Sequence, residues 1–481
     1  MCAQCNQQSF GFHPLGRREI VARFDGGPIT SDAGGLLLRE AERLTEIIGQ
    51  FAACFTDHRN PDRIEHTVEE LVAQRVYALA LGYEDLNDHD DLRHDPLLAV
   101  LAGKKDPLGQ TRGRERDRGK SLAGKSTLNR LELTPVGANA ESRYKKVTVD
   151  RSAVQRLFTD VFLQSHKRPP KRIVLDLDAT DDSIHGHQSG RFFHGYYKNY
   201  CYLPLYIFCG GHLLCARLRP SNIDASAGSV KELERIVGQI RERWPRVQIV
   251  IRGDSGFCRE AIMAWCEAKG VDFVLGLAKN ERLIAEVEKE LEQAKCQYLD
   301  TQQAARLFKD FHYQTRTSWS RSRRVIGKAE HLAKGANPRF VVTSLSAEAF
   351  DAQTLYEQEY CARGEMENRI KEQQLCLFAD RTSAATMRAN ELRLWFSSVA
   401  YTLMNALRRL GLKKTSMAKA RCDTIRLKLL KIGAQVRVTF RKVWVSLAES
   451  CPYRSVFQQV HENLRQIPNN VIGLRPIPMR C

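Results

Sequence analysis

The chain has 481 residues, of which 43% are hydrophobic, and its formal net charge is +18. This length is enough for two or three domains with full hydrophobic cores. The sequence lacks an apolar run of about 18 residues that could span a membrane, and its first residues lack the apolar segment of a signal peptide. We therefore expect a cytoplasmic protein with no membrane partner, whose 14 cysteines are reduced thiols.

The positive charge is concentrated toward the C-terminal end. Residues 1–100 contain 9 Lys or Arg and 17 Asp or Glu, whereas residues 381–481 contain 19 and 4. Such asymmetry favours a polyanionic partner, most simply nucleic acid, held mainly by the later parts of the chain. A solvated basic surface is the alternative.

In chain order, the first predicted region is helical. Apolar residues recur at helical spacing between 30 and 100, which predicts a helical N-terminal region over residues 1–103. Residues 104–125 are polar and charged and indicate an exposed loop, so we assign 104–170 to a basic linker. The stretch GKSLAGKS (119–126) matches a phosphate-binding loop, but no buried strand precedes it and no nucleotide cofactor is expected.

From residue 171 to 281 the pattern changes to strands and helices. A buried strand at RIVLDLD is followed by two apolar runs, a helix, a strand, a second helix and a last strand. Strands joined by short turns should be antiparallel, while strands separated by helices should run parallel to a neighbour. The order β-β-β-α-β-α-β predicts an α/β fold, with a mixed sheet flanked by helices.

Acidic residues end two of these strands. Asp176 and Asp178 lie on one face of the first strand because side chains alternate, and Asp254 stands at the end of the fourth. A single Asp at a strand end is about as often a turn or helix cap. Two such ends in a strongly basic protein favour a metal site, because a carboxylate at the edge of a core needs a compensating cation.

A long helix is predicted over residues 354–378, after a less regular segment. Tyr360, Arg363, Glu367 and Lys371 are spaced three or four apart and share one stripe of this helix. Solvated salt bridges among the last three are the structural alternative.

Three motifs carry a family resemblance. LDLDAT at 175–180, RGDSGF around Asp254, and YCARGEMEN around Glu367 together resemble bacterial insertion-sequence transposases of the DDE class, which have a ribonuclease-H-like catalytic core. The last motif fits the pattern Tyr, two residues, Arg, three residues, Glu. The family pattern has a Lys seven residues after the Glu, where this chain has Gln374, and Lys371 is the nearest basic residue on the stripe.

The resemblance implies a division of the chain. The ribonuclease-H-like core would occupy 171–281 and 346–410, interrupted by a β-rich insertion at 282–345. Residues 1–103 would recognise DNA ends, 104–170 would contact DNA, and 411–481 would form a basic, mainly helical C-terminal region.

The resemblance also implies a chemistry. Asp178, Asp254 and Glu367 would bind two Mg²⁺ ions, for which Mn²⁺ can substitute, with Asp176 as the competing first ligand. The reaction would be hydrolysis at the transposon ends, followed by attack of the freed 3′-hydroxyl on target DNA. Two alternatives are a ribonuclease-H-like nuclease that does not join DNA, and a transposase-derived DNA-binding protein that has lost chemistry.

The expected partners follow from this reaction. The protein would bind double-stranded DNA, both transposon ends and target, as a homo-oligomer in a synaptic complex, and would associate with the bacterial nucleoid. DNA contacts are expected from six residues, in the stripe and in the insertion: Tyr360, Arg363, Lys371, Trp319, Arg323 and Arg324. For Trp319, stacking on an unpaired base and packing in a core are both open.

Overall fold

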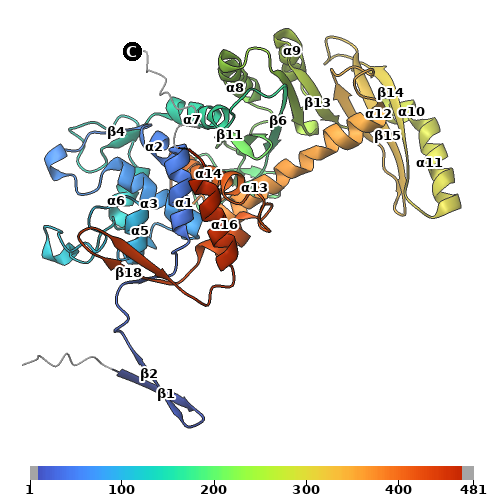
Figure 1. The fold of residues 1–481 in the computed structure, drawn as a ribbon. Coiled ribbons are helices and arrows are strands. Elements are labelled where there is room, and N and C mark those ends of the chain that lie inside the picture. Colours follow the sequence, from blue (N-terminus) through green and yellow to red (C-terminus); the bar gives the residue numbers. More distant parts are fainter. Residues whose placement is uncertain (1–8, 469–481) are drawn as a thin grey trace, which may run out of the picture. The chain divides into compact units, whose positions relative to one another are not determined.

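The computed structural model describes residues 9–468 and divides the chain into two compact units (Figure 1). Among the described residues, one unit combines 9–150 with 399–468, and the other contains 151–398. The regions predicted at the two ends of the chain therefore fold together in one unit. No helix within residues 9–468 has the length and apolar character needed to cross a membrane.

The second unit is built on a mixed sheet, as predicted. Its strand order is β11-β10-β6-β12-β13-β17-β15-β14, and the short β16 (Gly335–Ala336) pairs with β15. The first five strands in this order are β11 (His212–Arg217), β10 (Leu205–Cys209), β6 (Arg172–Ala179), β12 (Gln248–Gly253) and β13 (Asp272–Leu277). Strand β6 runs antiparallel to β10 and parallel to β12, so the two acid-bearing strands are neighbours.

The two faces of this sheet are covered differently. Leu175 and Leu177 point to one face and pack with apolar side chains of helices α7 (Arg151–Gln164), α8 (Ser229–Arg243) and α9 (Glu260–Lys269). Val250 and Val274 point to the other face and pack against Leu355 at the start of the third-acid segment. Because side chains alternate along β6, Asp176 and Asp178 face that segment rather than the main core.

The region predicted as a β-rich insertion extends the main sheet. It begins with helices α10 (Glu281–Glu286) and α11 (Glu288–Thr301), followed by β14 (Ala305–Tyr313), β15 (Arg323–Leu332) and β17 (Arg339–Thr343). Strand β17 pairs antiparallel with both β13 and β15. The apolar runs of these strands are thereby buried in the same sheet as the acid-bearing strands.

The predicted second strand is split in two. Strand β9 (Asn199–Tyr202) belongs to a small sheet of order β7-β9-β8, with β7 (Asp182–Ser183) and β8 (Phe192–His194), and only β10 enters the main sheet. Pro204 lies at the break and has no backbone N–H to donate to a ladder.

The first unit has a helical core. It contains α1 (Gly35–Thr45), α2 (Ile47–Ala52), α3 (Val68–Leu81), α4 (His89–Leu92), α5 (Pro96–Leu101) and α6 (Lys125–Glu132). Two short pairs, β3 (Ile29–Thr30) with β18 (Ala434–Val438) and β4 (Phe55–Asp57) with β5 (Val147–Val149), connect distant segments. A hairpin of β1 (Ser9–Leu15) and β2 (Arg18–Arg23) precedes the helices.

The C-terminal region is less helical than predicted. After α14 (Met387–Leu410) come α15 (Cys422–Ile425), the π-helix η6 (Arg426–Leu430), a hairpin of β18 and β19 (Val443–Leu447), and α16 (Arg454–Arg465).

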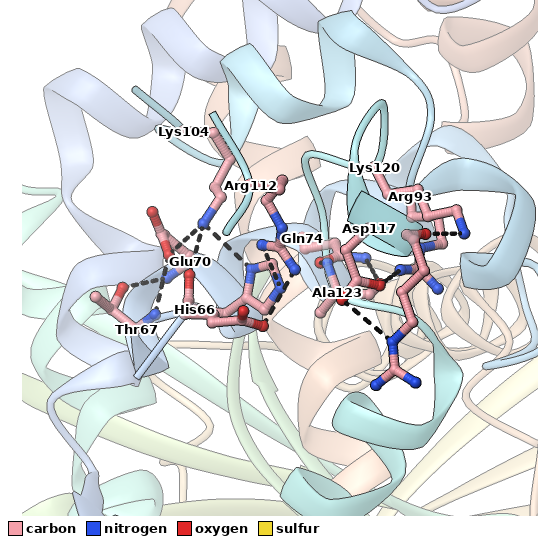
Figure 2. A network of polar contacts seen from close by, with 12 residues as sticks. His66, Thr67, Glu70, Gln74, Arg93, Lys104, Arg112, Asp117, Lys120 and Ala123 are labelled. Atoms are coloured by element: carbon pink, nitrogen blue, oxygen red, sulfur yellow. Dashed lines mark hydrogen bonds and ion pairs between the residues drawn. The ribbon is translucent and has the colours of Figure 1, made fainter. Parts of the chain in front are cut away.

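The polar segment after residue 103 is held against the helices, not left as a free loop (Figure 2). Lys104 Nζ lies 2.8 Å from Glu70 Oε2, and Gln74 exchanges two hydrogen bonds with the backbone of Ala123, at 2.8 and 3.0 Å. The charges that suggested an exposed loop are thus partly used within the unit.

Candidate active site

The three predicted acids occupy the same edge of the main sheet. Asp178 lies near the end of β6, and Asp254 follows β12 as the N-cap of the 3₁₀ helix η3 (Ser255–Phe257), where its carboxylate accepts from Gly256 N at 2.8 Å. Glu367 lies in the first turn of α13 (Gly364–Leu377).

Arg363 lies among these acids. Its guanidinium is 2.5 Å from Glu367 Oε1 and 3.6 Å from Asp178 Oδ2, and 16% of its side chain is exposed. The salt bridge between Arg363 and Glu367 is therefore present, but it is not confined to a solvated helix surface. Arg363 connects the helix to the acid at the end of β6.

The pKa shifts of Asp178 and Arg363 reflect both burial and the negative charge of the neighbouring acids. Burial is the largest cause that raises the pKa of Asp178 to about 7; the charges of Asp254 and Glu367 add to the rise, and Arg363 opposes it. Burial alone would lower the pKa of Arg363, yet the carboxylates of Asp178, Glu367 and Asp254 raise it. The three acids thus interact electrostatically with one another and with one shared cation.

The helix carrying the third acid is not a uniform α-helix, unlike the prediction. Helix α12 (Ala352–Thr354) continues into a π-helix, η4 (Leu355–Tyr360), and a 3₁₀ helix, η5 (Cys361–Arg363), before α13 begins. The π and 3₁₀ turns alter the angular spacing of the stripe just before Glu367. Such interruptions are frequent at functional sites.

Asp176 makes a different set of contacts from Asp178. Its carboxylate is buried and pairs in a two-point contact with Arg252, at 2.5 and 2.9 Å. Arg252 also donates to the carbonyl of Glu359 in the π-helix, and Arg172 of β6 pairs with the Glu359 carboxylate at 2.7 Å. Asp176 therefore helps to fasten the π-helix onto the sheet, while both of its oxygens are already bonded.

A groove of about 550 Å³ adjoins Asp254. Its lining includes the cations Lys279, Arg339 and Arg363 and the ring of Tyr360. Lys279 and Arg339 are exposed. Three cations beside one candidate catalytic acid suit a chain of phosphates that passes the site.

Gly276, in β13, sets the depth of this groove. A Cβ atom at this position would lie 2.5 Å from Tyr360 Oη and 3.0 Å from Ser255 N. Only a residue without a side chain lets Tyr360 lie this close to the strand.

Gln374, at the position of the family lysine, and Lys371, the nearest basic residue of the stripe, differ in exposure and contacts. Gln374 donates to Asp182 Oδ1 at 2.9 Å, and Asp182 is fully buried. Lys371 is exposed on α13. Gln374 is thus used inside the protein, and Lys371 is the residue of the two that is accessible to a ligand.

The insertion residues do not fit the predicted DNA contacts. Trp319 is 7% exposed and packs edge-on against Tyr313, with ring centroids 5.8 Å apart. Arg323 is buried between Glu260 and Glu267, at 2.7 Å from each, and Arg324 is held by Asp310 at 2.7 Å. The packing alternative for Trp319 is the one observed, and both arginines have their charge neutralised by the protein.

The acids fit a hard divalent cation by chemistry, since all their donor atoms are carboxylate oxygens. Burial and mutual repulsion leave Asp178 with a pKa near 7, a cost that a bound cation would relieve. Among residues 9–468, however, no three His, Cys, Asp or Glu side chains lie close enough together to hold one ion. Arg363 supplies the positive charge between Asp178 and Glu367 in this arrangement.

Several site residues had no separate signal in the sequence. Arg252 sits in the RGDSGF motif but finds its partner 76 residues away, and Lys279 and Arg339 reach the groove from two different strand ends. One usable signal was Arg252 itself, because a charged residue inside the apolar run VQIVIRGD requires a buried partner.

The comparisons with known proteins bear on the family of the chain. Residues 12–469 match the family model described as "Transposase DDE domain group 1". A search of curated proteins gives no match. Among solved structures, the chain is similar to a piggyBac transposase in a synaptic complex with hairpin DNA, at 13% identity and a TM-score of 0.38, over 93% of this chain and 87% of that one. Because the family model spans nearly the whole sequence, the chain belongs to the DDE transposase family.

Proposed function

We propose that this transposase cleaves DNA at the ends of a mobile element and joins the freed 3′-hydroxyl to target DNA. The observation that carries the proposal is that Arg363 pairs with Asp178 and Glu367 and is also within electrostatic reach of Asp254, at one sheet edge.

The sheet supports a ribonuclease-H-like core. Strands β11, β10 and β6 are antiparallel neighbours, β12 and β13 add in parallel on the other side of β6, and acids end β6 and β12. This arrangement places two acids from separate strands at one edge, with the third supplied by a helix that covers the same face.

In this proposal Asp178, Asp254 and Glu367 hold divalent metal, Mg²⁺ or Mn²⁺. When bound, the metal would activate a water or a 3′-hydroxyl and stabilise the oxygen that leaves phosphorus. Asp176 stays in its pair with Arg252 and acts as a positioning residue, because it fixes the π-helix that carries Tyr360 and that leads into the 3₁₀ helix carrying Arg363.

The chain's own cations would hold the DNA. Arg363 and Tyr360 lie at the groove beside Asp254, and Lys279 and Arg339 line the same groove, where they can contact phosphates on either side of the scissile bond. Lys371 would contact the end from the exposed face of α13.

The test uses a plasmid target, Mg²⁺ and linear DNA carrying the terminal sequences of the element. Products that are both cleaved and joined are expected from the wild type, and neither product from Asp254→Asn. Glu292→Gln, an exposed acid on α11, is the matched control and should behave as the wild type. Cleavage without joining would support a nuclease, and binding without either product would support a protein that has lost its chemistry.

The assembly state is measured on the same DNA. A complex containing two ends and more than one copy of the chain is expected by mass photometry. A single copy on a single end under conditions that give joined products would contradict the homo-oligomeric synaptic complex.

A further inference from the structure

The small sheet β7-β9-β8 has no role in the proposed function so far. It is inserted between β6 and β10 and ends in the tight turn of the β8–β9 hairpin, where Lys198 N donates to His194 O at 2.8 Å and Lys198 has a φ of 55°. This sheet therefore projects from the chain directly after the acid-bearing strand.

The base of the hairpin is firmly held. Tyr202 and Cys201 of β9 have no exposed surface, and Tyr202 Oη donates to Ser189 O at 2.6 Å. The buried Ser221 hydroxyl donates to Phe192 O at 2.9 Å. The hairpin is thus a supported projection, not a loose loop.

The outer part of the hairpin is aromatic and exposed. Tyr196 at the tip is 83% exposed, and the cross-strand pair Phe193 and Tyr200 is 59% and 48% exposed with ring centroids 5.6 Å apart. So many accessible rings on one short hairpin are unusual for a surface that faces only water.

Cations accompany these rings. The Arg191 guanidinium lies over the ring of Tyr200, 4.6 Å from its centroid, and Lys198 is exposed at the turn. Aromatic faces combined with basic side chains are the features with which proteins bind unpaired nucleotides, by stacking on the base and pairing with the phosphate.

The hairpin also contacts the strand of the first catalytic acid. Tyr197 Oη donates to the carbonyl of Ala179 at 3.3 Å, and Ala179 follows Asp178 directly. The ring centroid of Tyr197 lies 5.0 Å from that of Tyr196. The exposed tip is therefore continuous with the place where the phosphodiester bond is expected to be cut.

We propose that the β8–β9 hairpin binds an unpaired DNA base next to the cleaved bond, with Tyr196 and Phe193 as the stacking residues and Arg191 and Lys198 as the phosphate contacts. The inference rests on the proposed function, because it takes the nucleic acid at Asp178 to be DNA. Stacking would offset the loss of base pairing at the end and hold the strand in position for cleavage.

The test compares two fluorescent duplexes of one sequence, one fully paired and one with a central bubble of unpaired thymines. Binding is measured by anisotropy with the full chain in EDTA, so that no chemistry is needed. The wild type should bind the bubble about tenfold more tightly than the paired duplex, as expected for a base stacked on an aromatic ring. Tyr196→Ala and Phe193→Ala should lose this preference while binding the paired duplex as the wild type does.

Two variants serve as controls. Tyr196→Phe keeps the ring and should keep the preference, and Phe12→Ala, which removes a 61% exposed ring from β1, should also keep it. Melting temperatures of all variants are measured in parallel, and because Tyr196 is exposed, its substitution should not change folding.

The outcomes separate this inference from the proposed function. A wild type that cleaves its ends but binds bubble and paired duplex equally would overturn the hairpin inference alone. A preference that depends on Tyr196 in a protein without cleavage would leave the hairpin inference standing and remove the proposed function. Tyr196→Ala and Phe193→Ala could instead change the self-association of the DNA-free protein and leave the preference for the bubble unchanged. The hairpin would then bind a second copy of the chain, and the inference would be overturned.

Discussion

Replacing Asp178 by Asn should inactivate the enzyme and stabilise it at the same time. Burial and the neighbouring acids raise the pKa of this carboxyl from 3.8 to about 7, so its charged form is unfavourable in the folded protein. Asn has nearly the same shape and no charge. It removes the unfavourable charge and, with it, the group proposed to hold metal.

The magnitude follows from the difference in proton affinity between the two states. A pKa rise from 3.8 to about 7 corresponds to about 4 kcal/mol of destabilisation once the group is ionised in both states. The folded state binds the proton more tightly, so the penalty is absent below pH of about 4, grows as the pH rises, and is complete above about 7. Because 16% of the side chain is exposed, rearranging water will lower it to roughly 2 kcal/mol.

The assay is urea unfolding of wild type and Asp178→Asn in EDTA at several pH values, paired with cleavage in Mg²⁺. The variant should gain stability that increases between about pH 4 and pH 7, and should lose cleavage. Addition of Mg²⁺ should stabilise the wild type more than the variant. An Asn variant that is less stable than the wild type at pH 8, or that still cleaves, would refute the assignment of Asp178 as a strained metal ligand.

Four further substitutions test the surroundings of the acids. Arg363→Ala should slow cleavage at least about 100-fold with little change in melting temperature, and an active variant would return this arginine to a simple salt bridge. Gly276→Ala should weaken end cleavage by displacing the motif tyrosine, whereas Gly364→Ala, whose added Cβ meets nothing within 4 Å, should not; equal rates would show that the tyrosine position is unimportant. Asp176→Asn should cost about 3 kcal/mol in urea unfolding, since it leaves a buried arginine without its partner, but should keep cleavage at low temperature. Lys371→Ala should lower the dependence of DNA affinity on log salt by about one, and an unchanged slope would exclude a phosphate contact there.

The acid-bearing strands could be predicted because their signals are local. The apolar run around Leu175 and Leu177 marks a buried strand, and alternation places Asp176 and Asp178 on its other face. What alternation cannot show is which carboxylate is already bonded. The pairing of Asp176 with Arg252 depends on the lateral register of two parallel strands, and that register is set by the whole sheet.

The segment of the third acid also depends on long-range contacts that a local sequence pattern cannot predict. The spacing of Arg363 and Glu367 predicts a helix, and they do lie one turn apart in it. The π-helix before them is favoured by contacts from distant strands, including that of Arg172 with Glu359. The spacing of apolar residues along the helix does not predict these contacts. Trp319 was ambiguous for a related reason, because Arg and Ser neighbours suggest exposure while the ring packs against Tyr313.

The charge around Arg363 explains why a basic protein would keep an acidic centre. Three carboxylates act on this one guanidinium in a chain whose net charge is +18, and the other two cations of the site, Lys279 and Arg339, line the groove beside Asp254. Had Arg363 served only to stabilise its helix, contact with Glu367 would have been enough, at about 0.3–0.5 kcal/mol. Its approach to Asp178 instead ties the helix to the sheet edge and places one cation at the border between the acids and the groove. In the proposed function, a divalent metal bound by the acids would replace the positive charge that Arg363 supplies to them, and Arg363 would then link metal binding to DNA binding.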